Sequence, residues 1–361
     1  MKAAILLPVL AGADAVGNDA RAMVQLLIDR GIDARLFCDV AVGVADATYP
    51  ASELLEFAGG HDDLVIYHFS VGWPPGLDIL RRARGFRVVR YHNITPPEFF
   101  TEFSVDHAAA CADGRAEIPA LARLGCELYM CDSAYNAGEL VSAGADADST
   151  VVIAPFHRIA QLLEAPVDMT LLSELDDGTH NVLMVGRIAP NKGHVELVDA
   201  FARFVDGYGD PARLIIVGKS DPRLNAYSER IRARADAHQL GHRIWWLDSL
   251  NESQIKTAYL ASHAFMILSR HEGFCVPLIE AMALGVPIVA HASSAIPGTL
   301  GGGGIAWEEA DPWLYASSLQ RLRADDGFRN DLRDRAHRRF QREFAHDVLR
   351  DRFFAALEPA L

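Results

Sequence analysis

The sequence lacks long uncharged apolar runs, paired cysteine motifs and clustered basic residues. No stretch of 18 uncharged apolar residues occurs, which excludes an ordinary membrane-spanning helix. The five cysteines include no C-x-x-C pair, which argues against a disulfide framework or a zinc knuckle and favours a reducing compartment. We therefore expect a cytoplasmic protein. Lys2 and the apolar residues 3–13 also have the outline of a short secretory leader, but the strand–helix–strand pattern that follows favours a buried first strand.

The charge of the chain is distributed unevenly. Residues 1–176 carry 12 basic and 25 acidic side chains, whereas residues 177–361 carry 22 and 23. An acidic first half argues against a nucleic acid partner, because phosphate neutralisation needs clustered Lys and Arg. The nearly neutral second half suits an anionic small molecule better.

Short apolar runs alternate with amphipathic stretches over most of the 361 residues, which are 50% hydrophobic. Such runs predict parallel strands covered by helices on both faces, and the length predicts two domains. The predicted strands are Ala3–Val9, Ala34–Cys38, Leu64–Phe69, Arg87–His92, Leu128–Cys131, Val151–Ala154, Val182–Val185, Leu214–Val217, Ile244–Leu247, Ala264–Leu268 and Pro287–Ala290. We therefore predict an α/β protein with two Rossmann-like, doubly wound domains in tandem.

The regions outside the two sheets are a linker and a helical C-terminus. Pro166 and Gly178 interrupt the apolar periodicity, which places the linker within residues 164–179. Residues 311–361 are predicted to form consecutive helices. Their arginine-rich face is typical of a solvated helix surface, with a basic binding patch as the alternative; it comprises Arg333, Arg335, Arg338, Arg339 and Arg342.

Ligands of open α/β sheets bind outside the carboxyl ends of the strands, so the loops there are the candidate sites. Residues 12–18 join the first strand to a helix predicted at Asp19–Asp29, and Gly17 gives the backbone room to approach a ligand. The G-x-G-x-x-G dinucleotide fingerprint is absent. In the second half, Arg187 and Lys192 flank a turn after a strand. A guanidinium and an ammonium in such a place suit a diphosphate leaving group.

The strongest candidate segment is residues 270–280. Gly273 allows a close backbone approach, and the amides of residues 273–276 precede a helix whose dipole favours an anion. Glu272 can accept hydrogen bonds from sugar hydroxyls, and Glu280 from the two hydroxyls of a ribose. Because Glu280 stands in an apolar helix, where an unpaired carboxylate is costly, a hydroxyl-rich ligand is favoured over a surface role.

Residues 272–280 resemble the E-x7-E motif of retaining glycosyltransferases of family 4, which have the GT-B architecture. Residues 186–193 are similar to the G-R-x-x-x-x-K-G element of that family, and residues 214–218 and 281–290 match its usual runs. The likeness is specific over residues 180–292 and weak in the first half. It implies two Rossmann-like domains that face each other across a cleft, with C-terminal helices.

The resemblance also implies domain roles. Residues 1–170 form an acceptor-binding domain and residues 180–342 bind the nucleotide-sugar. A last helix, residues 343–361, packs back on the first domain. These boundaries are expectations of the family likeness together with the linker.

Site roles follow from the resemblance position by position. Arg187 and Lys192 hold the donor diphosphate and stabilise the leaving phosphate, and Glu272 orients the donor sugar. Glu280 binds the nucleotide ribose. The remaining candidates are backbone contacts to sugar and phosphates at Gly273, Phe274, Cys275 and Val276, the sugar-side histidine His92, and Gly17 in the first loop. Where the family often has a G-G pair, this chain has Val16-Gly17, so only Gly17 carries over.

The implied activity is retaining transfer of a hexose-type sugar from a UDP-, GDP- or dTDP-sugar to an acceptor hydroxyl, in glycan or glycoconjugate biosynthesis. No prosthetic group or metal is expected. The Asp-x-Asp string at residues 146–148 precedes a strand, on the wrong side of the sheet for a metal-dependent transferase. Two alternatives remain: a nucleotide-sugar 2-epimerase of similar architecture, and a non-catalytic nucleotide-sugar-binding protein.

The acceptor is expected to be a glycan or a lipid-linked sugar. A lipid-linked acceptor fits a cytoplasmic protein with peripheral contact at the inner membrane face. The basic cluster of the acidic half suits anionic headgroups, or else its last members are strand residues at a rim. This cluster comprises Arg81, Arg82, Arg84, Arg87 and Arg90.

Overall fold

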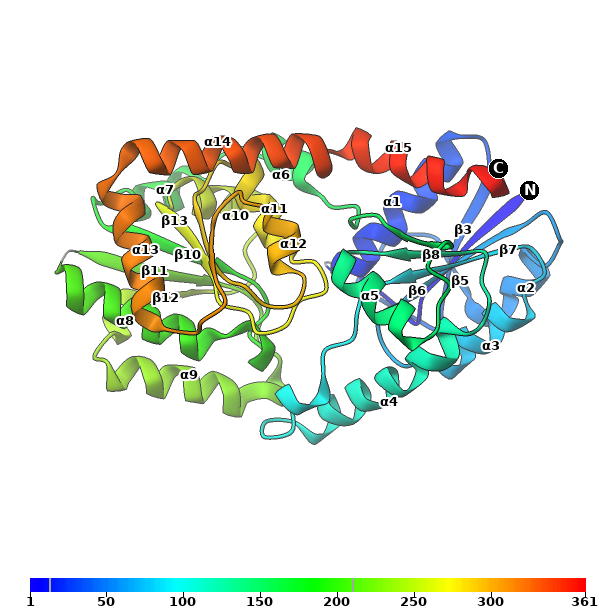
Figure 1. Ribbon diagram of the computed structural model, residues 1–361, viewed down its shortest axis with the longest axis horizontal. Coiled ribbons are helices and arrows are strands. Elements are labelled where there is room, and N and C mark those ends of the chain that lie inside the picture. Colours follow the sequence, from blue (N-terminus) through cyan, green and yellow to red (C-terminus); the bar gives the residue numbers. More distant parts are fainter. Residues whose placement is uncertain (13, 210) are drawn as a thin grey trace. The chain divides into compact units, whose positions relative to one another are not determined.

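The computed structural model describes residues 1–12, 14–209 and 211–361, which form two compact units (Figure 1). The first unit comprises Met1–Glu98, Asp106–His157 and Ala345–Leu361. The second comprises Phe99–Val105 and Arg158–Phe344. A short segment of the first half and the C-terminal segment therefore each belong to the unit formed mainly by the other half of the chain.

The first unit is built on a parallel sheet with the strand order β5-β3-β1-β6-β7-β8-β9. Its strands are β1 (Lys2–Leu6), β3 (Asp33–Cys38), β5 (Thr48–Pro50), β6 (Leu64–Phe69), β7 (Phe86–Tyr91), β8 (Leu128–Cys131) and β9 (Thr150–Val152), and β2 (Val9–Ala11) pairs separately with β4 (Val40–Val42). Every residue of the central strand β6 is buried. This explains its continuous apolar run, since a parallel strand covered on both faces has no polar side.

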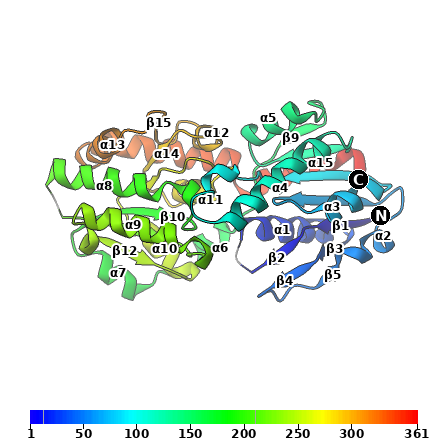
Figure 2. The same ribbon diagram turned by 90° about the horizontal axis from the view of Figure 1, so that it is seen from below.

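Helices pack on this sheet, and the C-terminal helix is one of them (Figure 2). They are α1 (Ala15–Asp29), α2 (Leu54–Phe57), α3 (Pro74–Arg82), α4 (Val105–Ala122), α5 (Ala134–Ala143) and α15 (His346–Leu357), with the 3₁₀ turns η1 (Ala51–Glu53), η2 (Pro97–Phe99) and η6 (Glu358–Ala360). Phe353 of α15 is fully buried and meets Phe156 edge-on, with ring centroids 5.7 Å apart. The guanidinium of Arg30 lies over the ring of Phe354.

The second unit contains a parallel sheet with the order β12-β11-β10-β13-β14-β15. The strands are β10 (His180–Val185), β11 (Ala212–Val217), β12 (Ile244–Leu247), β13 (Ala264–Ile267), β14 (Ile288–His291) and β15 (Ile305–Trp307). Val182 pairs with Leu214 on one side and with Ala264 on the other. Alternate residues such as Val182 and Met184 enter one hydrophobic core, as the two-residue period of a strand requires.

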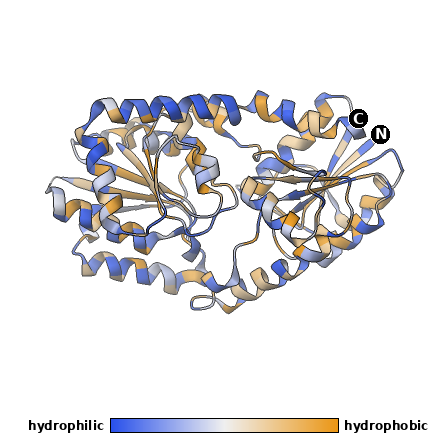
Figure 3. Ribbon diagram, in the orientation of Figure 1, coloured by the Kyte–Doolittle hydropathy of each residue, from blue (hydrophilic) through white to orange (hydrophobic). Residues whose placement is uncertain are grey.

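The helices of the second unit are α6 (Ile159–Glu164), α7 (Met169–Leu175), α8 (His194–Tyr208), α9 (Asn225–Ala237), α10 (Glu252–Leu260), α11 (Val276–Ala283), α12 (Ile296–Leu300), α13 (Pro312–Ala324) and α14 (Asp326–Glu343), with η3 (Pro190–Lys192), η4 (Pro222–Leu224) and η5 (Gly241–Arg243). Phe201 and Phe204 of α8 and Leu319 of α13 belong to the core described above. In Figure 3 the strands are mostly orange and α14 mostly blue, consistent with a buried sheet and a solvated helix.

The predicted α/β class with two Rossmann-like units is confirmed, and two local predictions are wrong. The first helix begins at Ala15 rather than Asp19, because the carboxylate of Asp14 caps it. The segment 164–179, expected to be a linker, contains α7, whose first amides are capped by Asp168. None of the helices formed by the described residues is long and apolar enough to cross a membrane.

Candidate active site

The carboxyl edge of the second sheet carries the predicted loop of residues 186–193, directly after β10. Gly193 has φ of +68°, and a Cβ there would lie 1.9 Å from the carbonyl oxygen of Leu268, just after β13. A Cβ at Gly218, just after β11, would lie 1.8 Å from the carbonyl oxygen of Gly186. Both positions therefore require glycine, and the ends of three neighbouring strands are held in close backbone contact.

Lys192 and Glu272 form the central ion pair of this edge. The ammonium of Lys192 donates to both oxygens of Glu272, at 2.7 and 2.8 Å. The side chains are only 16% and 7% exposed. Charges removed from water to this degree need a partner, so each holds the other in place. The structure thus brings together two residues 80 positions apart that were both predicted site residues.

Backbone and side-chain contacts hold the Glu272 loop. The Asn191 carbonyl accepts from the amide of Arg270 at 2.8 Å, and the Asn191 side chain donates to the carbonyl of His271 at 3.1 Å. The amide of Glu272 donates to the hydroxyl of Ser294 at 2.7 Å. These bonds tie the Lys192 and Glu272 loops together, and Asn191 and Ser294 were not singled out from the sequence.

The start of α11 forms the third part of the site. Cys275 precedes the helix with φ of +80°, and Pro277 lies in the first turn. The carbonyl of Phe274 accepts from the Thr299 hydroxyl at 2.8 Å. Within the described part of the chain, the amides of residues 273–276 donate to no protein acceptor. Such amides at a helix start can bind an anion.

Charged groups from the Lys192 and Glu272 loops and from α11 all act on the buried thiol of Cys275. Burial raises the pKa of Cys275 well above its usual value, and the carboxylates of Glu272 and Glu280 raise it further, while Lys192 opposes them. All three charges therefore act on one buried atom. This groups Glu280 with the Lys192–Glu272 pair.

Glu280 lies half-buried on α11, and among the described residues its carboxylate accepts a hydrogen bond from one side chain, Tyr259 of α10. The Tyr259 hydroxyl donates to Oε2 of Glu280 at 2.8 Å. Burial raises the pKa of the Glu280 carboxyl, and the hydrogen bond from Tyr259 partly opposes this shift. Tyr259 was missed in the sequence, because a tyrosine at helical spacing is typical of a core residue.

Arg187 is exposed on the same loop as Lys192. Lys219, an exposed cation after β11, is joined to this loop through its carbonyl, which accepts from the amide of Ile188 at 3.0 Å. Lys219 was also missed, although the rule that selected Arg187 applies to it, since it follows the carboxyl end of a strand. Arg187 and Lys219 therefore add two exposed cations, from neighbouring loops, to the half-buried Lys192.

The segment Phe99–Val105 brings residues of the first half into the second unit. Phe103 meets Tyr227 edge-on, and the guanidinium of Arg230 lies over the Phe103 ring. Phe99 lies 6.1 Å from the ring of His271, between centroids, next to the Glu272 loop. No sequence signal pointed to this placement, because the segment lies far along the chain from the unit on which it packs.

His92, a predicted catalytic residue, lies in the first unit after β7. Its side chain is 5% exposed, and both ring nitrogens are engaged. Nδ1 lies 2.9 Å from Asp132 Oδ2, and Nε2 lies 2.9 Å from Nδ1 of His68. Burial lowers the pKa of His68 well below its usual value, which favours its neutral form. These contacts fix the orientation of the His92 ring.

Arg90 joins the same buried network. Its Nε donates to Asp19 at 2.7 Å, and another nitrogen lies 2.9 Å from Asp132. Arg90 is fully buried, so the expectation that it faces anionic headgroups is wrong. Arg87, from the same predicted cluster, is paired with Glu127 at 2.9 Å. Arg87 and Arg90 both lie on β7. Because side chains alternate between the two faces of a sheet, residues three positions apart have different surroundings.

Asp19, His68 and His92 are the one trio among the described residues whose ligand atoms lie close enough to hold a metal ion. The Asp19 carboxylate already accepts from Arg90 and from the amide of Phe156, at 2.7 Å each. The two imidazoles are hydrogen-bonded to each other. Hydrogen bonds therefore account for the trio, and a guanidinium adjoins the position that a cation would need.

Gly17 lies in the first turn of α1, not in a loop before it. Its amide donates to Asp14 at 2.7 Å, so it is used for capping. A Cβ at Gly17 would lie 3.0 Å from the carbonyl oxygen of Ala11. Ala13, which belongs to the predicted loop of residues 12–18, lies outside the described residues.

The chain matches known proteins in sequence mainly over the second unit. Residues 173–339 match the family "Glycosyl transferases group 1". A serotype-specific mannosyltransferase WbdA of Escherichia coli is 30% identical over 146 residues, which is 40% of this chain and 16% of that protein. A D-inositol 3-phosphate glycosyltransferase of Corynebacterium efficiens is 32% identical over 151 residues, 40% of this chain and 35% of that protein. The chain thus spans well under half the length of these curated relatives.

Solved structures match the fold along the whole chain. Anabaena Alr3699/HepE in complex with UDP has a TM-score of 0.76 at 17% identity and covers 99% of this chain and 100% of its own. Sucrose-phosphate synthase of Thermosynechococcus elongatus has a TM-score of 0.76 at 19% identity, with full coverage of both chains. The chain therefore has the fold of these proteins.

Proposed function

We infer that the chain is a glycosyltransferase with the GT-B architecture and a group 1 domain in its second unit, and we propose that it transfers a hexose-type sugar from a nucleoside diphosphate sugar to an acceptor hydroxyl. One observation carries the proposal. The Lys192–Glu272 pair lies beside the start of α11, where the amides of residues 273–276 donate to no described acceptor. A cation and open amides suit a diphosphate, and the carboxylates of Glu272 and Glu280 suit hydroxyl groups.

The proposed mechanism is stabilisation of the leaving diphosphate. As the bond from the anomeric carbon to the diphosphate breaks, the acceptor oxygen bonds to that carbon and its proton passes to the leaving phosphate. Lys192, Arg187 and the amides of residues 273–276 stabilise the negative charge that develops on the diphosphate oxygens. Each such donor is typically worth about 3 kcal/mol of barrier. Glu272 orients the sugar. Its ion pair with Lys192 also holds the ammonium group in the site. Phe274, Cys275 and Val276 contribute through their backbones.

The two units take different partners in this proposal. The second unit, residues 180–342 in the sequence prediction, binds the nucleotide-sugar. The first, residues 1–170, binds the acceptor, a glycan or lipid-linked sugar, and His92 is its candidate residue for contact with a sugar. Both ring nitrogens of His92 are engaged by Asp132 and His68, so this role requires that Nε2 exchange its contact with His68 for a sugar hydroxyl. Gly17 has its amide capped by Asp14, so its contribution would be space rather than a hydrogen bond.

Uridine diphosphate is the first donor nucleotide to test, because the Anabaena neighbour binds UDP. GDP- and dTDP-linked sugars belong in the same panel, because the sequence resemblance leaves the nucleotide base open. The product serves the synthesis of glycans or glycoconjugates. We further propose that the anomeric configuration of the sugar is retained.

The test is release of nucleoside diphosphate from UDP-, GDP- and dTDP-sugars in the presence of a panel of acceptors. Glu272→Gln should lower turnover at least tenfold, whereas the matched exposed control Glu229→Gln should leave it within twofold. Proton NMR of the product gives the anomeric configuration. Release of an isomerised sugar nucleotide without acceptor, or donor binding without any turnover, would contradict the proposal.

A further inference from the structure

A cavity of about 470 Å³ lies at the opposite edge of the second sheet from Lys192 and Glu272. Its lining includes His180 at the start of β10, Pro211 directly before β11, His263 directly before β13 and Pro287 directly before β14. These residues mark the amino ends of the strands. The volume falls within the range of small-molecule sites, about 300–1,000 Å³.

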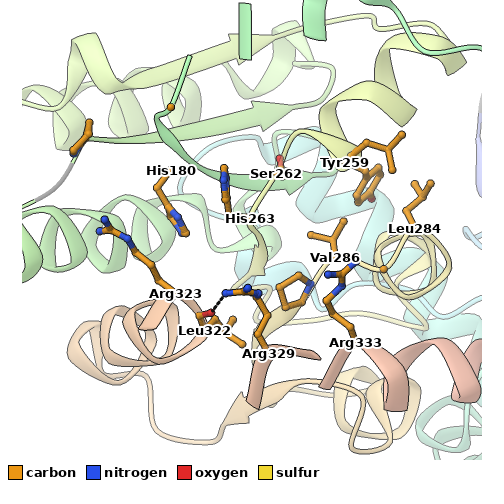
Figure 4. A pocket seen from close by; sticks show the side chains of 15 residues that line it. His180, Tyr259, Ser262, His263, Leu284, Val286, Leu322, Arg323, Arg329 and Arg333 are labelled. Carbon is orange, nitrogen blue, oxygen red and sulfur yellow. Dashed lines mark hydrogen bonds between the residues drawn. The ribbon is translucent and has the colours of Figure 1, made fainter. Parts of the chain in front are cut away.

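Three arginines face this cavity, from the end of α13 and from α14 (Figure 4). They are Arg323, Arg329 and Arg333. No carboxylate is among the lining residues that the structure describes. Burial lowers the pKa of His263, the charges of Arg329 and Arg323 lower it further, and the carboxylate of Asp176 opposes them. The described lining residues therefore carry a positive formal charge, with the carboxylates of Asp176 and Asp326 outside the lining.

The arginines differ in how far protein groups already satisfy them. Arg329 donates to the carbonyl of Leu322 at 2.9 Å and pairs at 2.8 Å with Asp326, whose side chain is 79% exposed. An ion pair with so exposed a carboxylate is weak, because water screens it. Arg333 makes no hydrogen bond or ion pair with any described residue. Two guanidinium groups one helical turn apart on α14 thus retain capacity for an anion.

The rest of the lining supplies a compact apolar wall. Leu284, Val286 and Pro287 belong to it, and the rings of His180 and His263 lie beside it, tilted by 32° to each other with centroids 4.6 Å apart (Figure 4). Apolar and ring surfaces of this kind accept the flat body of a small molecule. A free inorganic anion would leave this wall unused.

We propose that this cavity binds a small phosphorylated molecule, with its phosphate on Arg329 and Arg333 and a compact ring-bearing body against the apolar wall. The site is separate from the donor site, since it lies at the other edge of the same sheet. Tyr259 is common to both, because it lines the cavity and its hydroxyl donates to Glu280. Test variants therefore leave Tyr259 unchanged.

The test is isothermal titration calorimetry of the full chain with phenyl phosphate, which joins a phosphomonoester to one aromatic ring. We expect saturable binding, tighter than that of inorganic phosphate. Arg329→Gln/Arg333→Gln should weaken it at least tenfold. Arg338→Gln/Arg342→Gln removes the same charge from exposed positions of the same helix and should leave it within twofold.

Two further variants keep the test decisive. Arg333→Gln alone spares the Leu322 contact and should weaken binding at least threefold with unchanged thermal unfolding. Arg187→Ala/Lys192→Ala removes the donor-site cations and should leave phenyl phosphate binding within twofold. Absence of saturable binding, persistence in Arg329→Gln/Arg333→Gln, or loss in Arg187→Ala/Lys192→Ala would overturn the proposal. The first two outcomes leave sugar transfer untested, and the third would assign phosphate binding to the donor-site cations without contradicting sugar transfer.

Discussion

Lys192 combines two tasks at one atom, since its ammonium neutralises Glu272 and, in the proposed reaction, the leaving phosphate. Lys192→Ala should lower turnover at least tenfold while the chain still folds. It also leaves a carboxylate that is 7% exposed without its cation, which we expect to cost about 2 kcal/mol of unfolding free energy. Steady-state kinetics and urea unfolding measure the two effects, and near-normal turnover would remove the assigned role.

The Glu280 carboxylate should promote donor binding but lower the free energy of unfolding. The pKa of Glu280 is higher in the folded state. At a pH between the unfolded and folded values, the folded protein therefore holds a proton that the unfolded chain has released. A penalty therefore builds as pH rises from the unfolded pKa through the folded one and is full above it. Glu280→Gln should be more stable than the wild type at pH 7, and the gain should vanish as pH falls below the unfolded pKa.

Donor affinity should respond in the opposite direction. The same Glu280→Gln variant should bind the nucleotide-sugar at least tenfold more weakly, because an amide accepts two hydroxyls less well than a carboxylate. Tyr259→Phe removes a bond that favours the charged form, so the acid-side loss of donor binding should move to higher pH. Equal stability of the wild type and Glu280→Gln at pH 7 would show that the carboxylate carries no penalty.

Arg90 provides the clearest stability test among single residues. It stands between Asp19 and Asp132, and all three side chains are 5% exposed or less. Arg90→Gln should lower the unfolding free energy by about 3–5 kcal/mol, because two buried carboxylates lose their counter-charge. In urea unfolding, Asp19→Asn/Arg90→Gln should lose less than the sum of the single variants; additive losses would contradict the proposed pairing.

Residues with a chemical motif were predictable, and residues that support them were not. Lys192, Glu272 and Glu280 stand at family spacing, so their grouping could be anticipated. Tyr259 and Asn191 act through contacts between distant segments, and their residue types are common in cores and turns. His92 was singled out, but its bond to His68 depends on the pairing of β6 with β7, which spacing along the chain does not reveal.

At the scale of elements, the Gly193 turn positions Lys192 at the end of β10. Gly193→Ala places a Cβ 1.9 Å from the Leu268 carbonyl and must displace one of the two loops. We expect at least a tenfold loss of turnover. Gly209→Ala is a matched control at the other end of α8, with φ of +69° and, apart from its chain neighbours, no described atom within 4 Å of the new Cβ, so it should cost only about 1 kcal/mol and leave turnover unchanged.

Equal effects of the two alanine variants on turnover would mean that the left-handed backbone alone matters at Gly193. Both variants carry the backbone strain, but only Gly193→Ala must displace a loop. The difference between their thermal unfolding temperatures therefore measures the effect of the displacement. The close approach itself follows from the sheet register, which places the ends of β10, β11 and β13 side by side.

Strands were more predictable than the segments between them. The apolar runs at β6, β10 and β13 identify buried strands because both faces are covered. The segment around α7 was misjudged, since a proline and polar residues there mask a short helix that Asp168 caps. The packing of residues 99–105 on the second unit is a tertiary property without a local signal.

At the scale of the whole molecule, α15 stabilises a unit far from it in sequence. Leu349, Phe353 and Leu357 are fully buried in the first unit. Phe353→Ala should cost about 3–5 kcal/mol. Hydrogen exchange should quicken in β1 and β6 and stay unchanged in β10 and β13. Faster exchange in β10 and β13 alone would contradict this assignment of α15.

The central claim is that the second unit holds a sugar nucleotide by its diphosphate and hydroxyls. The most direct measurement is a crystal structure of the protein with the best-binding nucleoside diphosphate from the donor panel. We expect its phosphates within hydrogen-bond distance of Lys192 Nζ and the amides of residues 273–276, and its ribose hydroxyls on Glu280. A nucleotide bound elsewhere, with the Lys192–Glu272 pair and Glu280 untouched, would contradict the account.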